Sequence, residues 1–260
     1  MTEATPEAFV RVERRFSAAY ITVDRPEARN ALTEPMRMRL RSILAELADD
    51  SALRVVVVRG GGGTFVSGAD IREFLEQRTT ADVLRAAAVD EQLCLAIEAV
   101  PAPVVAVLEG HTLGGGLTLA CACDLRIAAR DAKLGIPSAK SLGNALTPGA
   151  YARLAATIGP ARVKELLIVA PILSAEQAAD WGLVNEVVDT DALDERVAAL
   201  VERLSGHAPL TMWAAKEAMR RIVHPFPAET DVLERVIESR DFREGVAAFV
   251  EKRAPSWHNE

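Results

Sequence analysis

The sequence predicts an α/β fold built around parallel strands, and three observations support this prediction. Three short, largely apolar runs at 55–58, 104–108 and 125–129 have the composition of strands that are covered on both faces. Glycines follow the first two runs, and segments with a helical spacing of apolar residues lie between the runs. This repetition of strand, glycine turn and helix favours a parallel sheet with ligand sites at the carboxyl ends of its strands.

The N-terminal elements follow from the same patterns. Residues 9–12 and 18–23 are rich in β-forming residues and flank the charged stretch 13–15, so they predict a hairpin with its turn at the charges. Apolar residues recur at helical spacing over 34–47 and again over 81–100. We therefore expect one helix before the first central strand and another before the second.

The C-terminal part of the sequence is predicted to be helical. Three segments there share a helical spacing of apolar residues and are separated by prolines: 193–204, 210–223 and 229–250. We therefore divide the chain into a core over residues 1–198 and a helical region over residues 199–260.

Composition and charge exclude several classes of protein. The 260 residues are 50% hydrophobic and 26% charged, which is ordinary for a folded globular chain. The net charge of -7 argues against a nucleic-acid-binding protein, which usually carries a concentrated basic face. No run of about 18 apolar residues and no apolar leader is present, so we expect a cytoplasmic protein that does not bind membranes. The three cysteines lack a zinc-like spacing with histidine, which fits a reducing compartment.

Two glycine-bearing segments, 60–71 and 110–119, are the candidates for chemistry. Neither is a phosphate-binding P-loop or a dinucleotide-binding G-x-G-x-x-G motif, because the required residues are missing. Glycines after a buried strand let a ligand approach the backbone, and the helix that follows offers free N–H groups. Two such turns on neighbouring strands could direct two N–H donors at one oxygen, forming an oxyanion hole. On the pattern alone, simple tight turns remain the more common explanation.

Several longer segments make the sequence recognisable. They are FVSGADI at 65–71, PVVAVLEG at 103–110 with GGG at 114–116, CDL at 123–125, SAEQAADWGLV at 174–184 and REGVAAFVEKR at 243–253. In this order, over nearly the whole chain, they resemble the crotonase family, also called the enoyl-CoA hydratase/isomerase family. The resemblance implies a crotonase-like spiral of ββα units, with a helical C-terminal region that assembles a homotrimer or a dimer of trimers.

The resemblance also implies a ligand and the groups that hold it. Family members bind an acyl-CoA thioester and hold its carbonyl with two backbone N–H groups, which correspond here to Ala69 and Gly115. Their reactions pass through a thioester enolate, whose oxygen gains negative charge that two such donors stabilise. Coenzyme A is part of the substrate, so the resemblance implies no separate cofactor and no metal.

Further positions would line the coenzyme A path. By the resemblance these are Ser67, Ala69, Asp70 and Ile71, with Arg29 contacting phosphate and Phe249 and Lys252 reaching coenzyme A from a neighbouring protomer. Because the chain is acidic and coenzyme A carries several phosphate charges, a few placed cations must attract it. Arg29, Arg72 and Lys252 are the candidates, although arginines and lysines at such positions are more often solvated surface charges.

The sequence departs from the family at both catalytic positions. Hydratases of the family have one Glu two residues after Gly-Gly-Gly and a second about twenty residues later, where this chain has Thr118 and Ser138. A hydroxyl, whose pKa lies far above neutrality, cannot replace a carboxylate base. We therefore expect poor hydration and favour enolate chemistry such as decarboxylation or isomerisation with substrate-assisted proton transfer. A non-catalytic acyl-CoA-binding protein is the alternative.

Other side chains offer no clear acid or base. His111 is more simply a packed residue at a strand end, Asp70 a carboxylate that complements a helix dipole, and Asp124 a structural residue. A polar pocket that binds a substrate group without ionising is a further interpretation, and its members would be Thr118, Ser138, Ser141, Asn144 and Tyr151.

Overall fold

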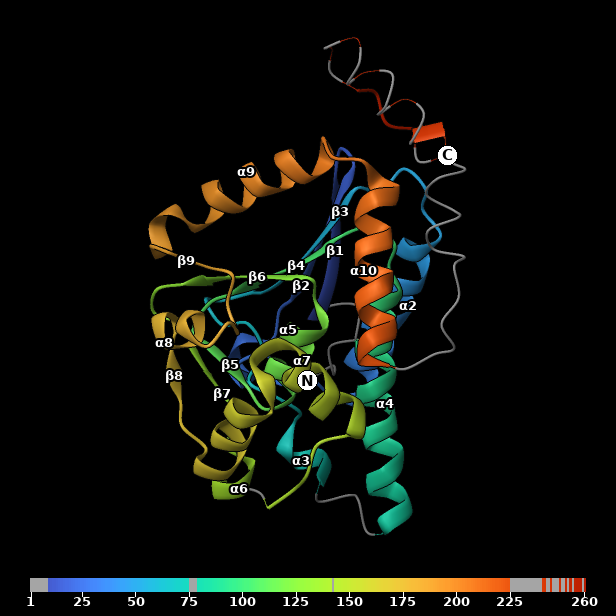
Figure 1. Cartoon of the computed structure of the whole chain (residues 1–260). Helices are drawn as coiled ribbons and strands as arrows, with labels where there is room; N and C mark the ends of the chain where they lie inside the picture. The colour runs from blue at the N-terminus through green and yellow to red at the C-terminus, as the bar shows by residue number, and fades with distance from the viewer. Residues whose placement is uncertain are drawn as a thin grey trace.

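A computed structural model describes residues 9–74, 79–141 and 143–224, together with 240, 241, 244, 248, 251, 253, 255–258 and 260 (Figure 1). Most of the helix predicted over 229–250 lies outside these residues, as do Phe249 and Lys252.

The centre of the molecule is a six-stranded sheet in the order β1-β2-β3-β4-β6-β9. Its strands are β1 (Val10–Arg15), β2 (Ala18–Val23), β3 (Val55–Gly60), β4 (Val104–Leu108), β6 (Leu125–Ala129) and β9 (Glu186–Val188). The pair β1 and β2 is antiparallel, whereas every other neighbouring pair is parallel. The three apolar runs are therefore adjacent parallel strands, as the sequence predicts.

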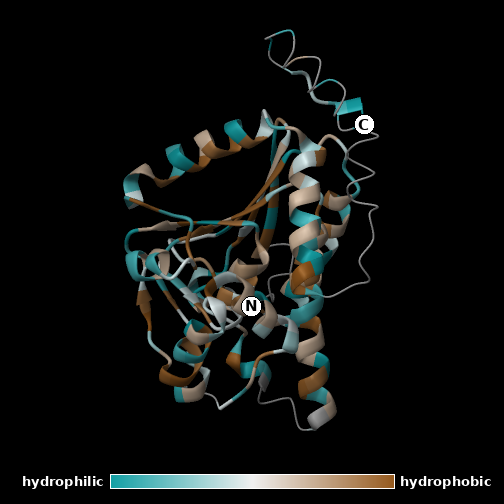
Figure 2. Cartoon of the chain, viewed as in Figure 1, coloured by the Kyte–Doolittle hydropathy of each residue, from teal (hydrophilic) through white to brown (hydrophobic). Residues whose placement is uncertain are grey.

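The alternation of side chains along the central strands builds two apolar layers. Val56 and Val58 join the larger layer, to which α2 (Glu34–Ala48), α4 (Thr80–Ala99), α5 (Gly115–Ala122) and α7 (Pro148–Lys164) contribute. Val55 and Val57 point to the opposite face and pack under α9 (Leu193–Ser205). Figure 1 shows α9 across the sheet from the other helices, and Figure 2 shows its hydrophilic residues alternating with hydrophobic ones. A four-valine run serves both layers because successive side chains point to opposite faces.

The remaining helical elements are short, apart from α10. They are η1 (Pro26–Ala28), α3 (Ile71–Phe74), α6 (Ser138–Ser141), η2 (Glu165–Val169), α8 (Ala175–Asp180), η3 (Thr190–Ala192) and α10 (Pro209–Val223). The helices α9 and α10 agree with two of the predicted C-terminal helices. The predicted boundary between residues 198 and 199 falls inside α9. The division into 1–198 and 199–260 stays a prediction.

A second, three-stranded sheet was not predicted from the sequence. It contains β5 (His111–Leu113), β7 (Lys133–Gly135) and β8 (Leu173–Ser174), in which β5 and β7 are parallel. Strands of two or three residues are too short to show an alternation of apolar and polar side chains. Its consequence for the site is that the second glycine segment contains a strand, β5, before the helix α5 begins at Gly115.

The position of the first turn also differs from the prediction. The charged stretch 13–15 belongs to β1, and the turn follows at Phe16, whose φ is +53°. An edge strand accepts charges because most of its side chains face solvent, and here every residue of β1 after Val10 is exposed.

Candidate functional site

The two glycine segments lie side by side at the carboxyl ends of β3 and β4. The N–H of Phe65 donates to the carbonyl of Glu109 at 2.8 Å, and the N–H of Leu113 donates to the carbonyl of Val66 at 3.1 Å. This pairing brings Ala69 next to the start of α5. A Cβ built on Gly115 would lie 3.8 Å from the nitrogen of Ala69.

Leu32 fixes the direction of the Ala69 N–H group. The N–H of Leu32 donates to the carbonyl of Gly68, and the N–H of Asp70 donates to the carbonyl of Leu32, each at 2.9 Å. In such a parallel pairing the polar groups of the middle residue point away from the partner strand. The N–H of Ala69 therefore points away from Leu32.

Neither candidate donor has an acceptor among the residues that the structure describes. Within the described part of the chain, no oxygen accepts a hydrogen bond from the N–H of Ala69 or of Gly115. Gly115 is the first residue of α5, where the helix leaves N–H groups unpaired and carries partial positive charge. Two neighbouring free donors can therefore serve a ligand oxygen.

Glycine is required at two places for this close approach. A Cβ on Gly116 would lie only 2.0 Å from the carbonyl oxygen of Val66, so any side chain there would push the two segments apart. Gly68 has a φ of +119°, a conformation that residues with a side chain rarely adopt. The glycines predicted to form the turns are thus needed for the fit between them.

Arg29 and Ser67 lie at the rim of this arrangement. The N–H of Ser67 donates to the carbonyl of Arg29 at 3.1 Å, and Arg29 ends η1 in the left-handed conformation. The Arg29 side chain is exposed, and none of the residues that the structure describes pairs with its guanidinium group. The predicted phosphate contact therefore lies next to the segment that carries Ala69.

Asn30 is a residue of this region that the sequence did not single out. Its buried side chain donates to the carbonyls of Gly61 and Thr64 at 2.9 and 2.5 Å and accepts from the N–H of Arg25. It thereby fastens the loop after β2 to the first glycine segment. An Asn in a loop between a strand and a helix is too common a pattern to have indicated this role.

Asp70 is held in an ion-pair network. Its carboxylate accepts from Arg72 Nη2 at 2.7 Å and from Arg25 Nη1 at 2.8 Å. Hydrogen bonds from Arg72, and then from Arg25, hold the pKa of Asp70 well below its ordinary range, although burial acts against them. The group is therefore a permanent anion at neutral pH and cannot donate a proton. Ile71, which follows it, is exposed.

Thr118 and Ser138 are the residues that the sequence resemblance assigns to the positions of the catalytic Glu pair. Thr118 is 8% exposed, and its hydroxyl donates to the carbonyl of Gly115 at 2.9 Å, one turn back along α5. Ser138 begins α6 and is partly exposed. Among the described residues, no carboxylate or imidazole hydrogen-bonds to either hydroxyl.

The other candidate residues lie on several different elements. His111 lies on β5 opposite Lys133, and Asp124 accepts from the N–H of Val104 and from Lys216 Nζ, both at 2.7 Å. The hydroxyl of Ser141 donates back to the carbonyl of Pro137. Asn144 and Tyr151 are exposed. Asp124 thus connects the start of β4 to α10, which agrees with its interpretation as a structural residue.

A cluster of charged residues that no motif revealed joins three helices. Arg153 of α7 donates to Glu91 and Glu98 of α4, and His224 at the end of α10 lies 3.0 Å from Glu98. Although burial raises it, the pKa of Glu91 falls below its ordinary value because Arg153 and Thr147 donate hydrogen bonds to the carboxylate. These partners are more than 50 positions apart in sequence, so only the fold could show the cluster.

The three cysteines are buried and unpaired with one another. Burial raises the pKa of Cys123 to about 12 and also raises the pKa values of Cys94 and Cys121. Thiols that stay protonated are poor nucleophiles. The cysteines therefore pack as small apolar side chains.

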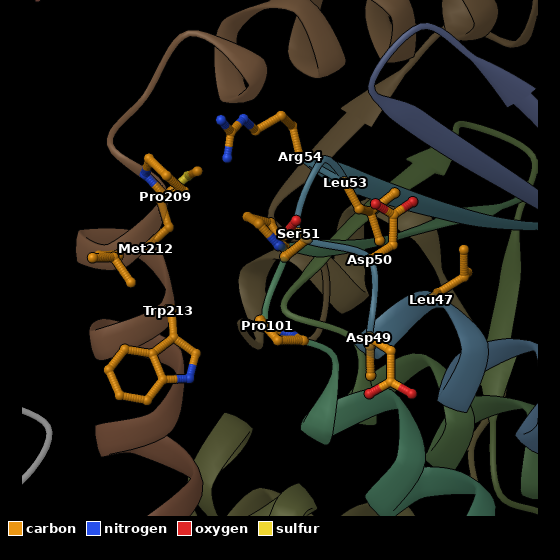
Figure 3. A pocket seen from close by; sticks show the side chains of 14 residues that line it. Leu47, Asp49, Asp50, Ser51, Leu53, Arg54, Pro101, Pro209, Met212 and Trp213 are labelled. Atoms are coloured by element: carbon orange, nitrogen blue, oxygen red, sulfur yellow. The ribbon is translucent and has the colours of Figure 1, made fainter. Parts of the chain in front are cut away.

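A pocket of about 150 Å³ lies at the other end of the sheet (Figure 3). It is lined by residues that precede β3 and β4, including Leu53, Arg54 and Pro101, and by Trp213 of α10. The glycine segments follow the same two strands, so the pocket and the Ala69–Gly115 pair lie at opposite ends. The pocket is not part of the candidate site.

The described residues contain no group of three or more His, Cys, Asp or Glu side chains arranged to hold a metal ion. None of the helices formed by these residues has the length and apolar character needed to cross a membrane.

A family model described as enoyl-CoA hydratase/isomerase matches residues 13–260. The chain belongs to this family. It is 33% identical over 93% of its length to a crotonyl-CoA hydratase from Syntrophomonas wolfei, covering 95% of that protein. It is 30% identical over 95% of its length to a 2,3-dehydroadipyl-CoA hydratase from Escherichia coli, covering 97% of that protein.

Solved structures of the enoyl-CoA hydratase/isomerase family match the fold. An enoyl-CoA hydratase/carnithine racemase from Magnetospirillum magneticum superimposes with a TM-score of 0.90 at 35% identity, covering 97% of this chain and 96% of that one. An enoyl-CoA hydratase from Bacillus anthracis gives a TM-score of 0.86 at 32% identity, covering 97% and 100%. The predicted crotonase fold with its helical C-terminal region is confirmed.

Proposed function

We propose that this protein binds an acyl-CoA thioester and stabilises the enolate of its acyl group with the N–H groups of Ala69 and Gly115. The observation that carries the proposal is the pair of neighbouring donors with no acceptor among the described residues. An enolate oxygen between them would receive two hydrogen bonds as its negative charge develops. Loss of one such donor typically costs about 3–4 kcal/mol in the transition state.

The reaction that we propose is a lyase or isomerase reaction other than ordinary hydration. Thr118 and Ser138 supply hydroxyls where water activation needs carboxylates, and the Thr118 hydroxyl already donates to Gly115. Decarboxylation fits this site because the electron pair of the breaking C–C bond enters the enolate without a protein base. Isomerisation with proton transfer assisted by the substrate also fits.

A non-catalytic acyl-CoA-binding protein is the second candidate, and a specific observation favours it. Asp70, the carboxylate next to Ala69, is neutralised by Arg25 and Arg72 and so is a poor acid and a weak base. A thioester clamp with no titratable partner would bind its ligand without turning it over.

We also propose the contacts and assembly that the resemblance implies. Coenzyme A would run past Ser67, Asp70 and Ile71, with Arg29 at its phosphates. In a homotrimer or a dimer of trimers, Phe249 and Lys252 of a neighbouring protomer would complete the site. The protein would work in the cytoplasm with coenzyme A as part of its substrate and with no separate cofactor.

Ligand-induced stabilisation followed by product analysis tests this proposal. Saturating crotonyl-CoA should raise the melting temperature, because a ligand that binds only the folded state adds about 2.7 kcal/mol at a hundredfold excess over its Kd. A panel of CoA thioesters analysed by mass spectrometry should then give a product for one acyl class. Binding without any product would support the non-catalytic candidate, and the absence of any thermal shift would refute acyl-CoA binding itself.

A further inference from the structure

Arg37, in the first turns of α2, is a buried cation that the glycine motifs do not include. It is 3% exposed, and its Nη1 donates to the carbonyl of Leu32 at 2.8 Å. Its Nη2 donates to Glu73 Oε2 at 2.8 Å, and its Nε lies 3.2 Å from Asp90 Oδ1. Burial of a guanidinium group is costly unless partners of this kind compensate it.

The carbonyl of Leu32 links Arg37 to the candidate site. That oxygen accepts both from Arg37 Nη1 and from the N–H of Asp70. The N–H of Leu32 donates to the carbonyl of Gly68, so the segment that pairs with Leu32 has Ala69 at its centre. Arg37 therefore fixes the strand position that sets the direction of the Ala69 N–H.

Glu73 links Arg37 to the other end of the same segment. Glu73 follows Ala69 by four residues and lies in α3. Its Oε2 accepts from Arg37, and its Oε1 accepts from the N–H of Glu34 at 2.6 Å. The segment from Gly68 to Glu73 is thus bonded at one end to Leu32, just before α2, and at the other end to the first turn of α2, and Arg37 donates hydrogen bonds to both Leu32 and Glu73.

We propose that Arg37 is a positioning residue for the Ala69 N–H donor, an inference that rests on the proposed function of that donor. Arg37 holds Leu32 and Glu73 at a fixed separation, and the Ala69 N–H consequently keeps its direction toward the ligand oxygen. A shift of about 1 Å in a catalytic group can lower a rate by about a hundredfold. Lysine cannot replace Arg37 because an ammonium group cannot direct separate N–H groups at both partners in this fixed geometry.

Difference infrared spectroscopy of bound butyryl-CoA labelled with ¹³C at the carbonyl tests this inference. A saturated thioester cannot be hydrated, so the complex stays intact during the measurement. In the wild-type protein the carbonyl stretch should move to lower frequency, because two hydrogen bonds polarise the bond. In Arg37→Lys and Arg37→Met the carbonyl stretch should lie closer to the frequency that butyryl-CoA has in water. The preference for butyryl-CoA over free coenzyme A should fall about tenfold.

Arg126→Lys is the matched control. Arg126 is also a buried arginine, and it donates to the carbonyls of Leu183 and Cys123 at 2.7 and 2.8 Å. It has no contact with the segment from Gly68 to Glu73 among the described residues. This variant should lose stability but keep the full carbonyl shift.

The outcomes separate the two proposals. Absence of a carbonyl shift in the wild-type protein would refute the proposed function of Ala69 and Gly115. A normal shift in the wild type that stays unchanged in the folded Arg37 variants would overturn the positioning role. If neither Arg37 variant folds, Glu73→Gln provides the test, because it weakens the contact between Arg37 and Glu73 while Arg37 stays in place. An unchanged shift in that variant would also overturn the role.

Discussion

The carbonyl oxygen of Val66 occupies the space that a side chain on Gly116 would need, because a Cβ there would lie 2.0 Å from that oxygen. The contact holds the first turn of α5 against the segment that leads to Ala69. The distance between the two candidate donors therefore depends on the absence of one methyl group.

Gly116→Ala should destabilise the protein and weaken ligand binding together. Overpacking of this kind typically costs about 1–3 kcal/mol, and relief of the clash would move α5 away from Ala69. Urea unfolding and titration with butyryl-CoA would measure the two effects. Gly206→Ala is the control: a Cβ there would lie 3.5 Å from the carbonyl of Arg203. This control should change stability by less than about 0.5 kcal/mol.

Gly115→Pro should remove one donor while the helix α5 is kept. Proline is tolerated at the first position of a helix, where its missing N–H has no intrahelical acceptor. The variant should bind acyl-CoA no better than free coenzyme A in isothermal titration calorimetry. Gly115→Ala keeps the N–H, and its Cβ would lie 3.8 Å from Ala69 N, so it should bind normally. Equal binding by both variants would argue against an oxyanion hole at Gly115.

The Asp70 network predicts a specific dependence of stability on pH. Its pKa is lower in the folded state, because of Arg72 and Arg25, than the value of about 3.9 expected in the unfolded chain. The stabilisation is therefore complete above about pH 4 to 5 and is lost as the pH falls below 3.9. At pH 7, Asp70→Asn should cost about 1–3 kcal/mol in the free energy of unfolding.

The free energy of unfolding of the wild type should exceed that of Asp70→Asn by less and less as the pH falls from about 5 to about 2, because the carboxyl of the unfolded chain takes up its proton in this range. Denaturant melts at each pH would follow this difference. Asp189→Asn is the control, because Asp189 pairs with Arg130 on the surface, where ion pairs contribute about 0–1 kcal/mol. A difference that stays constant with pH would contradict the proposed coupling between Asp70 and its arginines.

The wild-type protein should hydrate crotonyl-CoA far more slowly than ordinary enzymes turn over, which is about 1–10³ s⁻¹. The double variant Thr118→Glu with Ser138→Glu should raise the rate, because it puts a pair of carboxylates at the positions where the resemblance expects the catalytic acid and base. Loss of the enoyl absorbance would report hydration, and each single variant is a control. Wild-type turnover at an ordinary rate would mean that another acid and base are present.

Much of the fold could be predicted because the central strands are long and buried on both faces. The valines of β3 carry this signal without help from distant residues. The strands β5, β7 and β8 could not be predicted, because two or three residues show no periodicity. The charged residues of β1 were predicted to form a turn, because the sequence does not show that this strand lies at the edge of the sheet, where charges face solvent.

The candidate site was predictable to the extent that it lies in continuous glycine segments. The ties that hold it were not, because they join residues far apart in the chain. Arg37 and Glu73 are 36 positions apart, and Arg25 and Asp70 are 45 apart. Each is an ordinary charged residue until the fold buries it beside its partner.

We expect Arg29 to attract the phosphates of coenzyme A to this chain, whose net charge is -7. Its guanidinium group is free among the described residues, and its carbonyl is bonded to the N–H of Ser67. Arg29→Gln should therefore weaken acyl-CoA binding about two- to fivefold, as expected for an exposed ionic contact. The loss should be smaller at high salt, where such contacts are screened. Calorimetry at two salt concentrations measures both effects, with Arg130→Gln as a surface control that should bind normally. A loss of affinity that is independent of salt, or equal in the control, would exclude a specific phosphate contact at Arg29.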